Sequence, residues 1–180
     1  MISIRQFVEE RLKLKVDEQK SGVDSPVKRK FIGYSFYNTR GQYKLRVHAK
    51  SFKRLKDKIR DITNRNASMN FEARVRRLTE VTRGWVNYFK LADMKNHLKQ
   101  LDEWLRRRLR ACIWKTWKHI RTRYAKLKKL GIPEGKAWEF ANTRKGYWRI
   151  SSSPIVNRAI TNARLEKRGY ISMSNLFSRA

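Results

Sequence analysis

The chain has 180 residues, 40% of them hydrophobic, and carries 45 Lys and Arg against 15 Asp and Glu, a formal charge of +30. This apolar content is enough for a packed domain and excludes a disordered tail. So large a positive charge repels itself unless a polyanion neutralises it, so nucleic acid is the expected partner.

Other classes of protein fit less well. An anionic membrane surface is the competing polyanion, but no stretch approaches the roughly 18 apolar residues of a spanning helix. Glu9 and Glu10 interrupt the first apolar segment, which excludes a signal peptide, so the cytoplasm is the expected location. The single Cys112 excludes an intramolecular disulfide, and the few histidines show no zinc-ligand spacing, so neither a metal nor a cofactor is expected.

The first 49 residues predict a short helix followed by a β-hairpin. Residues 4–14 place their apolar side chains near one face, as a helix would. Residues 30–37 (KFIGYSFY) are almost continuously apolar, which is typical of a buried strand. Turn residues at 38–41 then lead into residues 42–48, where apolar and polar side chains alternate.

From Ser51 the apolar residues repeat with the period of a helix. Ser51 is the expected N-cap of a helix with Phe52, Leu55, Ile59 and Ile62 on one side. A polar loop at 64–70 precedes a second helix, whose stripe is Phe71, Val75, Leu78, Thr82, Trp85 and Phe89. A third, much longer helix is expected after Asp93, with a stripe from Leu98 to Leu127 that ends before Gly131 and Pro133.

The remaining residues change in character. The segment 136–154 is aromatic and loop-rich, and residues 154–166 predict a last helix that follows serine caps and is closed by Gly169. The predicted fold is therefore mostly α, a helical bundle preceded by a small helix and a β-hairpin. We expect three parts, at residues 1–49, 50–131 and 132–180.

Positive charge is concentrated in residues 104–129, which hold eleven Lys or Arg and no Asp or Glu. A helix face that is merely solvated usually mixes charges, because Glu–Lys pairs one turn apart stabilise it by roughly 0.2–0.5 kcal/mol each. Phosphate groups would supply the missing negative charge. The main candidates for phosphate contact are Arg106, Arg107, Arg108, Arg110, Lys115, Lys118, Arg121 and Arg123, followed by Lys53, Arg54, Arg74, Arg76 and Arg77.

Aromatic side chains could stack on bases or pack between helices. Trp85 lies on an apolar stripe and is expected in the core. Trp114 and Trp117 lie at the edge of their stripe, so both uses stay open for them.

No catalytic residue is predicted. The carboxylates of Asp17, Asp24, Asp57 and Asp61 occur singly, and there is no glycine-rich phosphate loop, nucleophile elbow or Cys and His pair.

Several segments resemble the C-terminal half of a group II intron reverse transcriptase and maturase. KRKFIGYSFY at 28–37 resembles the last palm motif, and TRGWVNYFKLAD at 82–93 resembles the signature of the maturase-specific, or X, domain. The segments 104–130 and 138–177 are similar to the basic C-terminal region of that family. The likeness covers nearly the whole chain.

The resemblance implies a polymerase thumb made of helices, whose maturase activity consists of contacts with intron RNA. It makes residues 1–49 a remnant of the palm, with Phe31, Gly33 and Tyr34 in a primer-grip-like position. The signature residues of the maturase domain would be Gly84, Trp85, Tyr88 and Phe89. The Tyr-Ala-Asp-Asp motif of the polymerase is absent from this sequence, so polymerisation would require another chain to supply those carboxylates.

Three functional hypotheses follow. The first is a maturase-like module that binds a structured group II intron RNA and assists its folding and splicing. The second is the thumb of an RNA-directed DNA polymerase that binds an RNA/DNA duplex together with a separate palm chain. The third is a general basic RNA-binding protein. A truncated or decayed reading frame, an internal start and one half of a split enzyme are all origins that fit this sequence.

Overall fold

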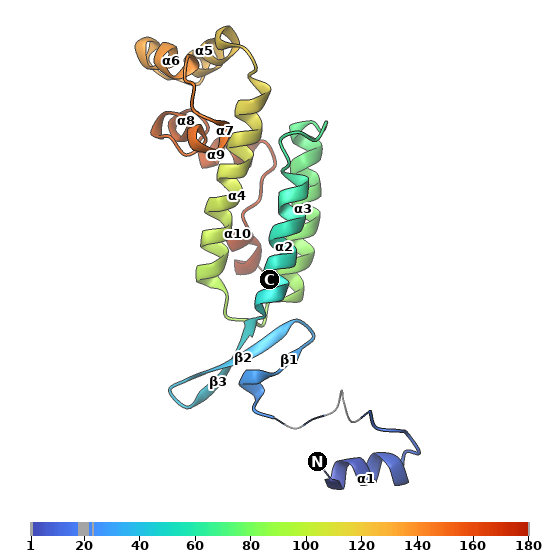
Figure 1. Cartoon of the computed structure of the whole chain (residues 1–180). Coiled ribbons are helices and arrows are strands. Elements are labelled where there is room, and N and C mark those ends of the chain that lie inside the picture. The colour runs from blue at the N-terminus through green and yellow to red at the C-terminus, as the bar shows by residue number, and fades with distance from the viewer. Residues whose placement is uncertain (1, 18–21, 23, 180) are drawn as a thin grey trace.

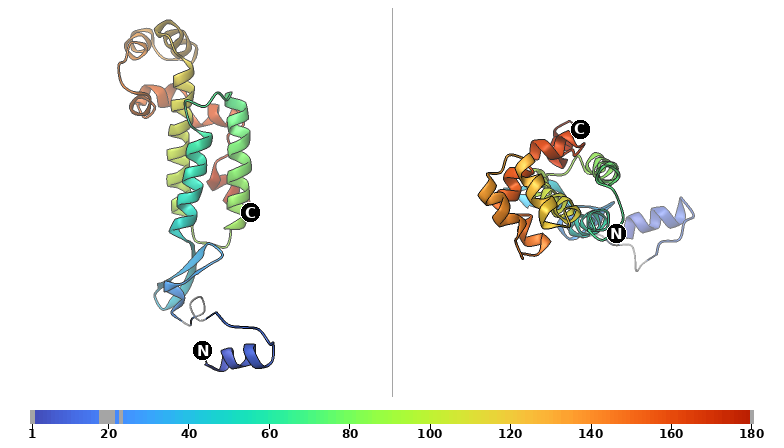
Figure 2. Two further views of the ribbon diagram at one scale, coloured as in Figure 1. Left: turned by 45° about the vertical axis from the view of Figure 1, so that its right-hand side comes forward. Right: turned by 90° about the horizontal axis from the view of Figure 1, so that it is seen from above.

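The computed structural model describes residues 2–17, 22 and 24–179. Three long helices stand side by side above a small sheet, with a lobe of short helices at the far end of α4 (Figure 1). The same elongated arrangement appears when the molecule is turned (Figure 2). The fold is mostly α, as predicted.

The N-terminal helix α1 (Ile2–Glu10) contributes no buried residue. It ends earlier than the predicted helix at 4–14. The large apolar side chains of this segment are more than half exposed to solvent: Ile2, Ile4, Phe7, Leu12 and Leu14. A 3-10 turn, η1 (Pro26–Lys28), precedes the sheet.

The sheet has three antiparallel strands in the order β1-β2-β3, namely β1 (Lys30–Phe31), β2 (Tyr34–Thr39) and β3 (Gln42–Val47). The prediction of one buried strand over 30–37 is wrong, because Ile32 and Gly33 form a two-residue turn that folds β1 back on β2. Both turn residues have positive φ, 49° and 85°, as a type I′ hairpin turn requires. The predicted hairpin at 38–41 is confirmed, with Arg40 and Gly41 at its tip.

Helix α2 (Ala49–Ile62) buries Leu55 and Ile59 on the predicted face. Ser51 is not its N-cap. The His48 side chain caps the helix through Nδ1, which accepts a hydrogen bond from the Lys50 amide at 3.2 Å. The Ser51 hydroxyl instead donates to the Gly33 carbonyl at 3.1 Å and fastens the helix to the sheet.

Helix α3 (Phe71–Tyr88) follows the polar loop as predicted, but the third helix is divided into α4 (Lys95–Thr116) and α5 (Ile120–Lys129). The break lies at Trp117, whose carbonyl accepts a hydrogen bond from Arg123 Nε at 2.9 Å. Periodicity did not reveal this break because both helices turn apolar side chains toward the same core.

Five short helices complete the chain: α6 (Glu134–Ala141), α7 (Tyr147–Ile150), α8 (Pro154–Ala159), α9 (Asn162–Lys167) and α10 (Met173–Ser178). The helix predicted at 154–166 is thus two helices. Ser153 does cap the first of them, but Thr161 interrupts the run and caps the second.

The C-terminal residues belong to the same core as the long helices. Buried side chains from Val47 of β3 to Met173 of α10 form one hydrophobic cluster. Helix α10 packs against α3 and α4. The buried Asp102 carboxylate on α4 accepts hydrogen bonds from the Tyr170 hydroxyl at 3.0 Å and from the Met173 and Ser174 amides at 2.7 and 3.0 Å. The division into three parts stays a prediction.

Candidate nucleic-acid interface

Helix α2 forms a basic ridge. It carries two Asp, of which Asp57 pairs with Arg60 at 2.5 Å, against six exposed cations: Lys50, Lys53, Arg54, Lys56, Lys58 and Arg60. A groove with aromatic side chains lies on each side of this helix. Alternation of aromatic surface and positive charge is the combination that nucleic-acid strands require.

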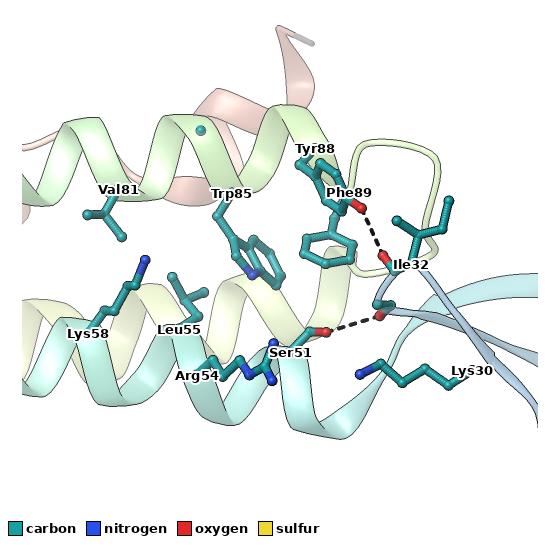
Figure 3. A pocket seen from close by; sticks show the side chains of 12 residues that line it. Lys30, Ile32, Ser51, Arg54, Leu55, Lys58, Val81, Trp85, Tyr88 and Phe89 are labelled. Atoms are coloured by element: carbon teal, nitrogen blue, oxygen red, sulfur yellow. Dashed lines mark hydrogen bonds between the residues drawn. The ribbon is translucent and has the colours of Figure 1, made fainter. Parts of the chain in front are cut away.

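Groove 1, which we define as the space between α2, α3 and the β1–β2 turn, has a volume of about 790 Å³. Lys30, Arg54 and Lys58 approach it from the sheet and from α2 (Figure 3). Trp85 and Tyr88 of α3 lie opposite. Positive side chains thus line one wall and aromatic rings the other.

Two tyrosines join the sheet to α3 at the end of groove 1. The Tyr34 hydroxyl donates to the Tyr88 carbonyl at 2.5 Å, and the Tyr88 hydroxyl donates to the Ile32 carbonyl at 2.9 Å. Burial, with a smaller contribution from Tyr88, raises the pKa of Tyr34. The Tyr34 ring also packs on Phe89, with ring centres 5.0 Å apart. The turn is therefore held rigidly against the helix.

The three primer-grip-like residues are separated by this arrangement. Gly33 lines groove 1, Tyr34 supports its end, and Phe31 is 68% exposed and outside its lining. The signature residues, by contrast, come together, because Gly84, Trp85, Tyr88 and Phe89 all line groove 1.

Groove 2, the space between α2 and α4, has a volume of about 590 Å³. The Phe52 and His97 rings stack in it with centres 5.2 Å apart, and the Arg60 guanidinium lies 5.8 Å from the Trp104 ring. Lys53 and Lys56 are also in its lining. The two grooves therefore share α2 as a common wall.

Most arginines of the α4 run make hydrogen bonds within the protein. Arg110 is buried and donates to the Ile160 carbonyl and the Asn162 side chain, both at 2.8 Å. Arg107 donates to the Trp148 carbonyl at 2.9 Å, and Arg108 donates to Thr63 and to the Arg60 carbonyl. These guanidinium groups connect α4 to its neighbours. Arg106 alone of the run is partly exposed with no such contact among the described residues.

Arg74 is also directed inward, which corrects its placement among the surface cations. It is 3% exposed and donates to the carbonyl of Ile62 at the end of α2 and to three backbone carbonyls of the following loop, among them Asn64 at 3.0 Å. The loop has many carbonyls and no secondary structure to satisfy them, so a buried guanidinium with five donors suits it.

The other predicted cations fall into two groups. Lys115 hydrogen-bonds Asn66, and Arg123 braces the break between α4 and α5. The side chains with exposed positions are Lys53, Arg54, Arg76, Arg77, Lys118 and Arg121.

Among the tryptophans, Trp114 and Trp117 are buried and pack on each other with ring centres 5.4 Å apart, so neither is open to a base. Trp85 is half-buried at the wall of groove 1. The exposed rings are Trp138 and Trp148, which sequence reasoning did not single out because they lie in short helices without a clear period.

Residues 52–131, which span α2 to α5 and contain most of both grooves, match the family model for the group II intron maturase-specific domain. This segment is a maturase-specific domain. No curated protein matches the chain. The resemblance at 82–93 is thereby confirmed, and the four residues expected to be its signature line groove 1.

Within the described part of the maturase-specific domain and its flanking segments, no three His, Cys, Asp or Glu side chains are grouped as metal ligands would be. No helix among the described residues is both long enough and apolar enough to cross a bilayer.

Proposed function

We propose that the chain is an RNA-binding maturase module that holds a group II intron RNA in a spliceable fold, with the α2 ridge and its two grooves as the contact surface. The maturase-specific domain supports a group II intron maturase role in general. The observation that carries the finer proposal is the position of α2, which places exposed cations beside aromatic walls on both of its sides.

The surface is better suited to recognising the shape of the RNA backbone than to reading the edges of its bases. The cations are long, exposed and spread along a helix, which suits phosphates that follow an irregular RNA surface. Recognition of a folded RNA through its backbone requires no base-specific hydrogen bonds. We therefore expect preference for the intron to depend on its tertiary fold.

The test compares binding of the purified chain to a folded group II intron RNA and to an unrelated structured RNA of equal length over a range of salt concentrations. Arg54→Gln with Lys58→Gln removes two charges from groove 1, and Lys53→Gln with Lys56→Gln removes two from groove 2. Each pair is expected to weaken binding and to flatten the salt slope by about one unit per lost phosphate contact.

The matched control is Lys95→Gln with Lys99→Gln, which removes the same charge from exposed positions on α4 outside both grooves. It should change the slope less. Equal losses in all three variants would show that only total charge matters, and would leave a general basic RNA-binding protein as the better description.

A second candidate, the thumb of a polymerase with a separate palm chain, is supported by one observation. Apolar side chains of α1 and of the β1–β2 turn are exposed, with Phe7 at 57% and Ile32 at 62%. Such surface is typical of an interface.

Mixing the chain with a separately produced palm should then yield a stable complex that extends a primer, and Phe7→Ser should weaken this complex. Failure to form a complex argues against this candidate and leaves the RNA-binding proposal intact.

A further inference from the structure

A smaller pocket adjoins the end of α2, the loop after it, α4 and α7. Its volume is about 390 Å³, and its lining includes Arg60, Arg65, Arg108 and Trp148. This volume is near the lower end of the range of roughly 300–1,000 Å³ for small-ligand sites. It suits a single nucleotide and is too small for a duplex.

The pocket brings positive charges together with little compensation. One carboxylate, Asp61, is in its lining, and Arg60 is paired with Asp57. Among the described residues, no carboxylate lies within ion-pair distance of Arg65 or Arg108. Burial lowers the pKa of Arg108, and the charges of Arg60 and Arg65 act in the same direction. An anion in the pocket would relieve this repulsion.

Trp148 offers a stacking surface beside these charges. The Arg107 guanidinium lies 3.9 Å from the centre of its ring and also donates to its carbonyl, which fixes the ring in place. The residue is nevertheless 39% exposed and lines the pocket. A ring that is held on one side and open on another can accept a base at low entropic cost.

We propose that this pocket binds one unpaired nucleotide of an RNA strand, whose base stacks on Trp148 while its phosphate contacts Arg65 and Arg108. The inference deepens the proposed RNA binding and rests on it. A base must be unstacked from its neighbours to enter, so the pocket selects single-stranded segments such as loops and bulges. Stacking on a ring tolerates any base, so little sequence preference is expected.

The experiment measures binding of the full chain to an eight-nucleotide single-stranded RNA and to an RNA duplex of equal charge. Trp148→Ala should lower the affinity for the single strand by roughly 5- to 150-fold with an unchanged salt slope, since a stacked base and no phosphate contact is lost. Trp148→Phe should retain most of the affinity. Arg65→Gln should reduce the salt slope by about one unit.

The matched control is Trp138→Ala, because Trp138 is 59% exposed but belongs to α6, away from the pocket lining. It should leave single-strand binding unchanged. Equal effects of Trp138→Ala and Trp148→Ala, or an equal loss of duplex binding in Trp148→Ala, would overturn the proposal. So would a free mononucleotide that binds as tightly as the oligomer.

A second test uses only the wild-type chain, so its result does not depend on whether the variants fold correctly. In this test the chain is cross-linked to an RNA that contains 4-thiouridine. The expected cross-linked peptide contains Trp148 or Arg65, and a cross-link confined to other peptides overturns the site. If the chain binds intron RNA through α2 and Trp148→Ala matches the wild type, only the pocket fails. If the wild-type chain binds no RNA, both proposals fail.

Discussion

At the scale of single residues, Gly33 contributes to the packing of the β1–β2 turn against the helices. Its φ is +85°, and a Cβ there would lie 3.0 Å from Ser51 Oγ and 3.1 Å from Phe89 Cζ. Its carbonyl also accepts hydrogen bonds from the His48 amide and the Ser51 hydroxyl, at 2.9 and 3.1 Å. The turn can approach the helices this closely only because the residue has no side chain.

We therefore expect Gly33→Ala to lower the free energy of unfolding by about 2–3 kcal/mol, the sum of left-handed strain and steric conflict. Chemical denaturation measures it. Gly41→Ala is the matched control, since Gly41 has a φ of +80° but nothing within 4 Å of the added Cβ. It should cost about 1 kcal/mol. Equal losses would show that strain alone acts at Gly33.

At the scale of elements, Arg74 organises the loop between α2 and α3. Its contacts with the loop carbonyls also hold the loop over Cys112 on α4, whose Sγ lies 3.3 Å from the Thr63 carbonyl. Burial raises the pKa of the Cys112 thiol, and the residue is only 7% exposed. The thiol is thus a natural reporter of loop opening.

Arg74→Ala should loosen this loop and accelerate reaction of Cys112 with a disulfide reagent at pH 8 by roughly tenfold or more, because several buried carbonyls lose their donors. Arg77→Ala, an exposed arginine on the same helix, should leave the rate unchanged. A rate for Arg74→Ala that equals the wild type would mean that the loop is held by other contacts.

A contact of the same kind ties the chain's last helix to the bundle. Asp102→Ala removes the acceptor for the Tyr170 hydroxyl and for two amides of α10, and should destabilise the fold by about 2–4 kcal/mol. The neighbouring Glu103 is exposed, so Glu103→Ala should change stability by less than about 0.5 kcal/mol in the same denaturation experiment. Similar losses in both variants would contradict the role of Asp102.

At the scale of the whole molecule, stability is unevenly distributed along its length. The core runs through α2, α3, α4 and the C-terminal helices, whereas α1 buries no residue. The sheet is expected to have intermediate stability, because two hydrogen bonds connect it to the bundle. The Tyr37 hydroxyl donates to the Asp93 carboxylate at 2.7 Å, and the Tyr34 hydroxyl donates to a carbonyl of α3.

Hydrogen exchange should therefore be fastest in α1, intermediate in the sheet and slowest in α4. Mass spectrometry of peptides from the exchanged chain measures this order. Faster exchange in α4 than in the hairpin would contradict it. Protection of α1 on addition of a palm polypeptide, but not on addition of RNA, would support the polymerase-thumb candidate over the maturase module.

Local patterns predicted much of this molecule. The β2–β3 hairpin, the apolar faces of α2 and α3 and the Ser153 cap depend on residues close in sequence, so alternation, helical period and turn residues were sufficient. The segment at 82–93 predicted the maturase-specific domain because its string of Gly, Trp, Tyr and Phe resembles the signature of that domain, and the family match over 52–131 includes it. Total charge alone established nucleic acid as the expected partner.

Only the tertiary structure decided which side chains point into the protein and which point toward solvent. Arg74 and Arg110 have the same sequence context as surface arginines, but loop carbonyls and the end of α8 lie within reach of them and draw them inward. Trp148 became a candidate because α7 carries it to the arginines of α2 and α4. The sequence thus determined how much charge and aromatic surface the protein has, whereas long-range packing decided which of it faces solvent, because that choice depends on residues far apart in the chain.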